Sequence, residues 1–247
     1  MCDEWMPYIQ LPLTIEEFRQ LPRNSAYKYE YLSKRVHLSP RPKHYHAVLE
    51  LGSIQVDESV GVQSIQASEL GSLERLFAGA FRHTQPYGSL DDDTLLEAAR
   101  QALERTRAGG DGPWIMQASF VAKLEEKLIG AILITLLPHG DPCDWDSYYW
   151  KDVPPPDCIE RRLGRAHLTW VFVAPSEKGR GAGTALLAAS VRELLALGFT
   201  ELYSTFMAGN DSSMLWHWRN GFQLLPHPGS HRLMRQRWLR DLEQPKA

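Results

Sequence analysis

The segment from His167 to Gly198 constrains the fold of this chain more than any other. It begins with HLTWVFV, a mostly apolar stretch rich in aromatic and β-branched residues, which predicts a strand in the interior of a sheet. Pro175 ends that strand, KGRGAG follows, and TALLAASVRELLALG then predicts a long helix closed by Gly198. A strand, a glycine-rich turn and a helix in this order form a site for an anion. The reason is that the first backbone N–H groups of a helix are unpaired and lie at the positive end of its dipole.

Several nucleotide-binding families use such a turn, and the residues around it distinguish among them. Gly181 and Gly183 let the backbone approach a phosphate, and Lys178 and Arg180 add positive charge. A nucleotide P-loop needs Lys-Ser or Lys-Thr after the last glycine, whereas Thr-Ala follows Gly183 here, and the G-x-G-x-x-G pattern is absent. A tight turn that merely requires glycine stays open as the alternative.

The turn resembles the signature of the GNAT superfamily of N-acetyltransferases, which is a strand with V-x-P followed by Q/R-x-x-G-x-G/A. Val173 and Pro175 supply the V-x-P. Gly181 and Gly183 match the glycines, and Lys178 stands where Gln or Arg is usual.

A second part of the same resemblance lies downstream, where the family continues with a strand and then N-x-x-A-x-x-L-Y-x-x-x-G-F. The chain has a predicted strand at Leu202–Phe206. The motif positions that follow are filled by Asn210, Ser213, Trp216, His217, Gly221 and Phe222. Because both motifs stand at the family spacing on the expected elements, the resemblance extends over about residues 61–238.

The resemblance implies an α+β fold, an α/β/α sandwich with a mixed, mostly antiparallel central sheet that has a V-shaped opening and is flanked by helices. We expect this domain to span residues 59–240, with an insertion at about 138–165, after an N-terminal helix and hairpin over residues 1–58. Periodicity of the apolar residues agrees with alternating strands and helices. Strands are predicted at Val62–Gln66, Met116–Lys123 and Leu128–Leu137, and helices at Ala67–Phe81 and directly after Asp91–Asp93.

The N-terminal extension has its own local signals. Thr14 with Glu17 predicts a capping box that opens a short helix, Tyr27–Val36 predicts a hairpin, and Ser39–His46 is basic and turn-like. These residues resemble the opening of the Uma-type restriction-endonuclease-like family, whose pattern is an xEEF helix, YELIDGELV and SPxPxH. The nuclease residues of that family have no counterpart that we can locate, so the resemblance implies a structural cap. A self-association or scaffold role is an alternative.

The GNAT resemblance implies acetyl-CoA or a close acyl-CoA as the donor and an amine as the acceptor, with no metal. Pantetheine pairs with the main chain of the strand before the turn, the pyrophosphate binds the amides of the turn, and the asparagine lies near the pantetheine. The residues assigned to cofactor binding are therefore Val171, Phe172, Val173, Lys178, Gly179, Arg180, Gly181, Ala182, Gly183, Thr184, Asn210 and Ser213.

Two histidines stand where the family has its proton-transferring residues. His217 replaces the tyrosine of L-Y-x-x-x-G-F, and His167 takes the place of a glutamate base, with Thr169 on the same face of the strand. Histidine titrates near neutral pH, so each can donate or accept a proton. The alternatives are a polar helix residue at 217 and a hydrogen-bonded sheet histidine at 167, neither with a chemical role.

The insertion at 138–165 combines aromatic residues with aspartates. A long loop of this composition is typical of a functional segment, and aromatic faces beside carboxylates suit a cationic amine. The alternative is a loop that packs its aromatic side chains against the N-terminal segment. The aromatic residues are Trp145, Tyr148, Tyr149 and Trp150.

Composition restricts the remaining functions. A net charge of −3 gives no basic footprint for nucleic acid, no apolar run approaches the roughly 18 residues of a membrane span, and the three cysteines match no zinc pattern. We expect a cytoplasmic enzyme that acetylates a primary amine by direct attack in a ternary complex. We expect no nucleic-acid or membrane partner, and a homodimer is one oligomeric state left open. The alternative is an acyl-CoA-binding regulatory module with little or no turnover.

Overall fold

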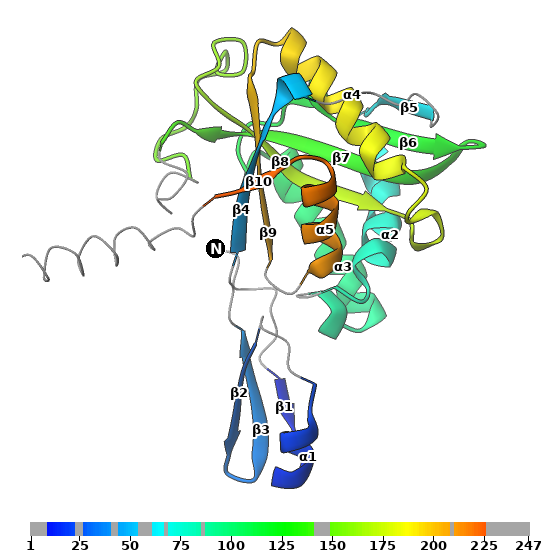
Figure 1. Ribbon diagram of the computed structural model, residues 1–247, viewed down its shortest axis with the longest axis vertical. Helices are drawn as coiled ribbons and strands as arrows, with labels where there is room; N and C mark the ends of the chain where they lie inside the picture. The colour runs from blue at the N-terminus through cyan, green and yellow to red at the C-terminus, as the bar shows by residue number, and fades with distance from the viewer. Residues whose placement is uncertain are drawn as a thin grey trace, which may run out of the picture.

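The computed structural model describes residues 9–22, 27–40, 44–53, 61–66, 69–84, 87–140, 149–207 and 210–225. Two sheets form within this part of the chain. One has three strands in the order β1-β3-β2, and the other has seven in the order β10-β4-β9-β8-β7-β6-β5. The small sheet and helix α1 project from one end of the larger lobe (Figure 1).

The seven-stranded sheet is mostly antiparallel, since all of its neighbouring strands run in opposite directions except β8 and β9. With helices on both faces, it confirms the expected α+β fold. Its strands are β4 (His44–Glu50), β5 (Gly61–Ser64), β6 (Phe120–Leu124), β7 (Lys127–Pro138), β8 (Gly164–Val173), β9 (Glu201–Met207) and β10 (Gln223–Leu224).

Each face of this sheet buries its own apolar cluster, because successive strand residues point to opposite sides. On one face α2 (Leu70–Phe81) and α3 (Asp92–Arg107) pack against Leu133 and Phe172. On the other face, α4 (Ala182–Ala196) packs against residues such as Ile134, and α5 (Asp211–Arg219) lies on the same side (Figure 1).

Local sequence signals place most helix ends correctly. Asp91 caps α3 by accepting a hydrogen bond from the Thr94 backbone N–H, and Gly198 follows α4 with a φ of 84°. The predicted strand at Met116–Lys123 was wrong in its first part. Met116–Ala118 form a 3-10 turn, because the Ser119 backbone N–H bonds to the Met116 carbonyl, and β6 begins only at Phe120.

The small sheet consists of β1 (Ile9–Leu11), β2 (Tyr27–Leu32) and β3 (Arg35–Pro40), with α1 (Ile15–Gln20) beside it. The predicted hairpin is confirmed by its two-residue turn, where Ser33 and Lys34 have φ values of 50° and 60°. The predicted capping box of α1 is also confirmed, since the Thr14 and Glu17 side chains bond to each other's backbone N–H.

The small sheet makes contact with the larger lobe. Its buried residues Tyr27, Val36 and Leu38 pack with Met207 of β9. The Tyr27 hydroxyl also lies 3.5 Å from the Ser89 hydroxyl. The end of β9 therefore contacts both sheets.

Strand β4 was not expected. The interpretation of Ser39–His46 as a turn was wrong for residues 39–40, which end β3, and for residues 44–46, which begin β4. The expected division after residue 58 separates β4 from a sheet in which it is an interior strand. It pairs with β9 along its whole length, from His44 opposite Met207 to Glu50 opposite Glu201. The basic, proline-containing stretch before it obscured a strand whose pairing partner lies far away in the sequence.

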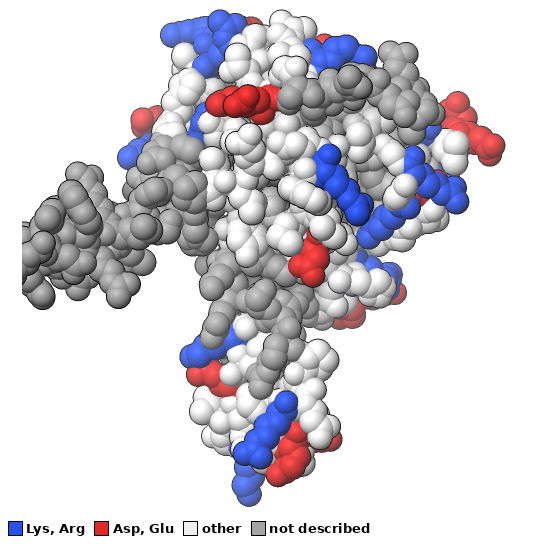
Figure 2. Space-filling model, viewed as in Figure 1, with Lys and Arg blue, Asp and Glu red and all other residues white. Residues whose placement is uncertain are grey.

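Charges of both signs are interspersed over the face shown in Figure 2, and the described residues form no broad area of a single sign there. Among these residues, no helix combines the length and the apolar character that a membrane crossing requires.

Candidate active site

Strands β8 and β9 separate partway along their length. They pair only from Ala166 opposite Leu202 to Leu168 opposite Ser204, although β8 continues to Val173. The register between β7 and β8 shifts at this point, which leaves Thr169 as an extra residue in β8. Such a bulge bends a strand, whereas β9 stays paired with β4 without a register shift as far as its last residue, so the two strands diverge.

A cavity of about 1200 Å³ lies at this fork and is lined by residues from both faces of the sheet. It brings together all but one of the predicted site residues. Arg180 is the exception, because its side chain is 69% exposed and pairs with Glu177 at 3.2 Å. The predicted residues that line the cavity are His167, Val171, Phe172, Val173, Lys178, Gly179, Gly181, Ala182, Gly183, Thr184, Asn210, Ser213 and His217.

The turn requires glycine for two different reasons, a left-handed backbone at two positions and close packing at a third. Gly179 and Gly181 have φ values of 79° and 88°, a left-handed conformation that glycine adopts without strain, and Gly181 is the N-cap of α4. Gly183 allows close packing instead, since a Cβ there would lie 3.0 Å from the indole nitrogen of Trp216. The N-terminus of α4, with its unpaired backbone N–H groups, thus forms part of the cavity wall.

Not every predicted binding residue presents its side chain to the cavity. Phe172 is only 4% exposed and packs edge-on against Phe77, with ring centroids 5.2 Å apart, so its main chain is the part available to a ligand. The Asn210 side chain caps α5 by accepting a hydrogen bond from the Ser213 backbone N–H at 3.1 Å. Both residues thus have structural roles as well as positions in the cavity wall.

His217 is buried on α5 and holds a defined tautomer. Its Nδ1 lies 2.7 Å from the Ser213 carbonyl oxygen, which can only accept, so Nδ1 carries the proton. Its Nε2 lies 2.7 Å from the Ser204 hydroxyl and accepts from it. Burial lowers the pKa of His217 to about 4, with the hydrogen bond to the Ser213 backbone acting in the opposite direction. The imidazole is therefore neutral at pH 7.

His167 is buried on β8 with both ring nitrogens in hydrogen bonds. Nδ1 lies 3.1 Å from the Thr169 hydroxyl, and Nε2 lies 3.1 Å from the Thr205 hydroxyl. Burial lowers the pKa of His167 to about 3, and electrostatic repulsion of a protonated His167 by His46, Arg165 and His217 acts in the same direction. His167 is likewise neutral at pH 7.

The two predicted catalytic histidines lie on opposite faces of the sheet. His167 shares a face with Thr205, whereas His217 contacts Ser204 on the side of α4 and α5. Residues 204 and 205 are adjacent on β9 and point in opposite directions. Since the cavity passes through the fork, it is lined by both imidazoles although neither contacts the other.

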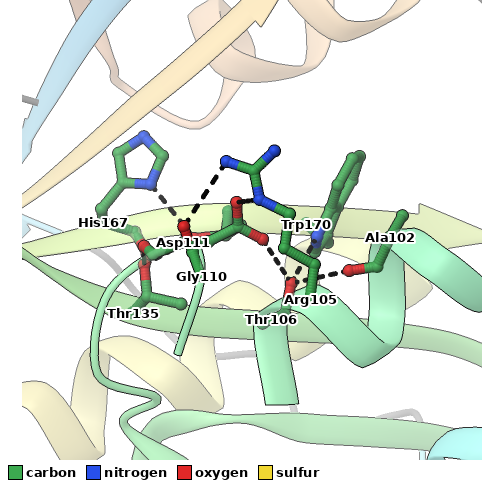
Figure 3. A network of polar contacts seen from close by, with 9 residues as sticks. Ala102, Arg105, Thr106, Gly110, Asp111, Thr135, His167 and Trp170 are labelled. Atoms are coloured by element: carbon green, nitrogen blue, oxygen red, sulfur yellow. Dashed lines mark hydrogen bonds and ion pairs between the residues drawn. The ribbon is translucent and has the colours of Figure 1, made fainter. Parts of the chain in front are cut away.

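A further polar network lies on the α2–α3 face, around Asp111 (Figure 3). The Asp111 carboxylate is paired with Arg105 at 2.8 Å and accepts a hydrogen bond from the Thr106 hydroxyl at 2.7 Å. Thr106 in turn accepts from the indole N–H of Trp170 at 2.9 Å. These contacts fix the loop after α3 against β8, where Arg105 and Asp111 form part of the cavity wall.

The described part of the insertion also reaches the cavity. Tyr149 and Trp150 line it, and the Trp150 indole N–H donates to the Leu136 carbonyl at 2.8 Å, so this ring is anchored on β7. Trp145 and Tyr148, with the aspartates at 141, 144 and 146, lie outside the described residues. Outside the cavity, Trp218 of α5 is 72% exposed.

Sequence reasoning missed several residues of the cavity wall. His44 and His46 come from β4, Ser204 and Thr205 from β9, and Asp111 from the loop after α3. The alternation in HYHAVLE was a usable strand signal for the two histidines. No local signal marks Ser204, Thr205 or Asp111, because only the sheet brings them to the fork.

A forked sheet with a glycine-bounded helix N-terminus in the wall of the fork is the arrangement that the resemblance implied for an acyltransferase with an acyl-CoA donor. The model of the acetyltransferase (GNAT) family matches residues 79–222, more than half of the chain. The chain belongs to this family and is an acetyl-CoA-dependent acyltransferase. Among curated proteins no match is found.

Solved structures similar to the chain include three acetyltransferases. PaiA N-acetyltransferase from Thermoplasma acidophilum, in complex with coenzyme A, is 14% identical with a TM-score of 0.46 over 67% of this chain and 90% of its own. A GNAT family acetyltransferase from Brucella melitensis, in complex with acetyl-CoA, is 15% identical with a TM-score of 0.44 over 70% and 94%. AAC(6')-Iy, in complex with a bisubstrate analogue, is 19% identical with a TM-score of 0.40 over 67% and 92%.

Proposed function

We propose that this protein transfers an acetyl group from acetyl-CoA to a primary amine, of a small molecule or a peptide, by direct attack in a ternary complex. The observation that carries the proposal is the cavity at the fork of β8 and β9, which connects the two faces of the sheet. Acetyl-CoA binds from the side of α4 and α5, and the amine approaches from the side of α2 and α3. Holding both substrates at one opening supplies much of the rate enhancement through proximity.

The donor site uses the main chain more than side chains. Pantetheine pairs with the β8 backbone from Val171 to Val173, where no β9 partner is present. The pyrophosphate binds the amides from Lys178 to Thr184, with the Lys178 side chain adding charge at the cavity wall. Arg180 contributes only long-range charge, because its side chain is outside the lining and paired with Glu177.

Proton transfer follows from the states of the two histidines. The uncharged amine attacks the thioester carbonyl, its nitrogen then loses a proton, and the departing thiolate gains one. His167 serves the amine on one face, and His217 serves the sulfur on the other through the Ser204 hydroxyl. Because both imidazoles are neutral at pH 7, His167 begins the cycle as the acceptor of the amine proton, and the thiolate gains that proton from His167 or one from water. His217 has no proton on Nε2 to give, so its role is to position the Ser204 hydroxyl near the sulfur.

The acceptor side favours a cationic amine with an apolar body. Phe81, Tyr87, Tyr149 and Trp150 line this part of the cavity, and aromatic faces bind cations. The described carboxylates of the lining are Asp111 and Glu177, and they are already paired with Arg105 and Arg180. The aspartates at 141, 144 and 146 lie outside the described residues, so their role stays a prediction, whereas Asp152 and Asp157 are described and do not line the cavity.

The domain division is also part of the proposal. The small sheet with α1 forms the N-terminal extension, and the acyltransferase domain takes in β4 together with the chain from β5 onward. A homodimer and a cytoplasmic location stay predictions.

Two measurements test the function. Acetyl-CoA is expected to raise the unfolding temperature, because a ligand at 100 times its Kd stabilises the folded state by about 2.7 kcal/mol. Release of free thiol is then measured with polyamines, aminoglycosides, amino acids and peptides as acceptors, and at least one class is expected to be turned over.

A matched control is Gly183→Val, whose side chain would collide with Trp216 and is expected to abolish the thermal shift. Absence of any shift with the wild-type protein would remove the donor assignment. A shift without thiol release from any acceptor would favour the regulatory-module alternative.

A further inference from the structure

A row of side-chain hydrogen bonds crosses four adjacent strands on the α2–α3 face of the sheet. It begins on strand β4 and ends at a main-chain carbonyl, and part of it is visible in Figure 3. The row consists of His46 on β4, Thr205 on β9, His167 and Thr169 on β8, Thr135 on β7 and the carbonyl of Asp111.

The carbonyl end fixes the direction of the row. The Thr135 hydroxyl donates to the Asp111 carbonyl oxygen at 2.9 Å, because a carbonyl can only accept. Thr135 has no second proton, so at its 2.8 Å contact with Thr169 it is Thr169 that donates. Thr169 therefore accepts from His167, and the proton of His167 lies on Nδ1.

The same reasoning continues to β4. Neutral His167 carries one proton, so its Nε2 accepts from the Thr205 hydroxyl at 3.1 Å. Thr205 has then used its own proton, and it accepts at 3.1 Å from Nδ1 of His46. One lone pair of the Thr205 oxygen, at the cavity wall, is left for a substrate N–H.

We propose that the Thr205 hydroxyl relays the proton of the attacking amine to His167, and that His46 is the positioning residue that orients this hydroxyl. This inference rests on the proposed function and deepens it. The amine N–H bond breaks and a new O–H bond forms on Thr205, while the original O–H bond of Thr205 breaks and an N–H bond forms at Nε2 of His167. The proton then leaves His167 for the departing thiolate or for water.

The positioning role gives β4 a chemical reason to lie in this sheet. The family model begins at residue 79, whereas β4 spans His44–Glu50. A strand from outside the matched region thus supplies the donor that sets the relay. His46 is 1% exposed, so the donor is held in place by packing as well as by its hydrogen bond.

Three substitutions at His46 differ in whether they keep an N–H group at the position of Nδ1, so comparing them isolates the role of that donor. His46→Asn keeps an N–H group close to the position of Nδ1 and is expected to retain most of the kcat. His46→Phe keeps the ring without a donor, and His46→Gln moves the N–H toward the position of Nε2. Both are expected to lower kcat by about 10- to 100-fold, up to the usual contribution of one proton-transferring group, with an unchanged KM for acetyl-CoA.

His37→Phe on β3 is the matched control, since the same substitution there lies outside the cavity lining. Equal loss in the Asn and Phe variants would overturn the positioning role. A double-mutant cycle adds a second criterion. If His46 acts through Thr205, combining His46→Phe with Thr205→Val lowers kcat no further than Thr205→Val alone, whereas additive losses contradict the relay.

The tautomers of the histidines can be measured without any turnover. Nitrogen-15 NMR of the wild-type imidazoles is expected to show His167 as the Nδ1–H tautomer and a proton on Nδ1 of His46. In Thr205→Val the signals of both rings are expected to shift. An Nε2–H tautomer at His167 would overturn the relay even if the enzyme acetylates amines. The expected tautomers in a protein without thiol release would instead point to failure of the proposed function.

Discussion

At the scale of the residue, burial rather than residue type decides what the two predicted catalytic histidines can do. Histidine was singled out because it titrates near neutral pH. In the folded protein both rings are buried, their pKa values are lowered to about 3 for His167 and about 4 for His217, and each ring has its tautomer fixed by a neighbour. Their proposed roles therefore pass through the hydroxyls of Thr205 and Ser204.

This burial has a consequence for stability against acid. In the unfolded chain each histidine has a pKa near 6.5, whereas in the folded chain the pKa is about 3 for His167 and about 4 for His217. Between these limits the unfolded state binds more protons, so the free energy of unfolding falls as the pH decreases from 6.5. Each histidine contributes up to about 1.4 kcal/mol per pH unit.

Urea denaturation of wild type, His167→Gln and His217→Gln between pH 7 and pH 4.5 measures this slope. Each substitution is expected to reduce the slope, since it removes one group that titrates differently in the two states. Slopes equal to that of the wild type would show that neither histidine is protected from protonation.

At the scale of the element, the strand, turn and helix from β8 to α4 follow from local sequence alone. Pro175, Gly181 and Gly198 mark the ends of the two elements, and the structure has β8 ending at Val173 and α4 running from Ala182 to Ala196. The reason for Gly183 is different. It depends on Trp216 of α5, which no local pattern of the turn could indicate.

Substitutions of these glycines should have separable effects. Gly181→Ala forces a side chain into the left-handed region and is expected to cost about 1 to 2 kcal/mol of stability. Gly183→Ala, with a Cβ at 3.0 Å from the Trp216 indole nitrogen, is expected to displace α5 and to weaken acetyl-CoA binding more than it lowers stability.

The control is Gly71→Ala on α2, where a Cβ would meet nothing within 4 Å and alanine is expected to stabilise the helix by roughly 0.5–1 kcal/mol. For each variant, calorimetric titration measures the affinity for acetyl-CoA, and urea denaturation measures the free energy of unfolding. An unchanged affinity of Gly183→Ala for acetyl-CoA would show that the close contact of Gly183 with Trp216 of α5 is not needed for cofactor binding.

At the scale of the whole molecule, β4 connects the N-terminal segment to the fork. Beyond Ser204, β9 has no pairing with β8, and β4 is its described hydrogen-bonding neighbour as far as Met207. The side of the fork formed by β9 is therefore held by a strand from the other end of the chain (Figure 1).

Two truncations test this dependence. A protein lacking residues 1–43 keeps β4 and is expected to unfold cooperatively, with some stability lost because the contacts of Tyr27 with Ser89 and of the small sheet with Met207 are gone. A protein lacking residues 1–53 loses β4 and is expected to be aggregated or to lack a cooperative transition. The reason is that the backbone N–H and C=O groups of β9 that pair with β4 are then exposed at an open sheet edge. Near-ultraviolet circular dichroism and urea denaturation distinguish the two. A cooperative native fold without β4 would contradict its supporting role.

The sequence by itself determined the class of fold, the strand and helix that bound the turn, and the set of residues around it. The strand and helix depend on local periodicity and on glycine and proline, whereas the class of fold and the residues around the turn were implied by the family resemblance of two short motifs. All of these signals lie close together along the chain. The tertiary structure alone decided that residues 44–50 form an interior strand, that Thr205 lies beside His167, and that Thr169 and Thr135 connect His167 to Asp111. It also decided that the two histidines occupy opposite faces of the sheet. Strand pairing joins segments more than a hundred residues apart, and the pKa values depend on burial, so neither could be inferred from neighbours in the sequence.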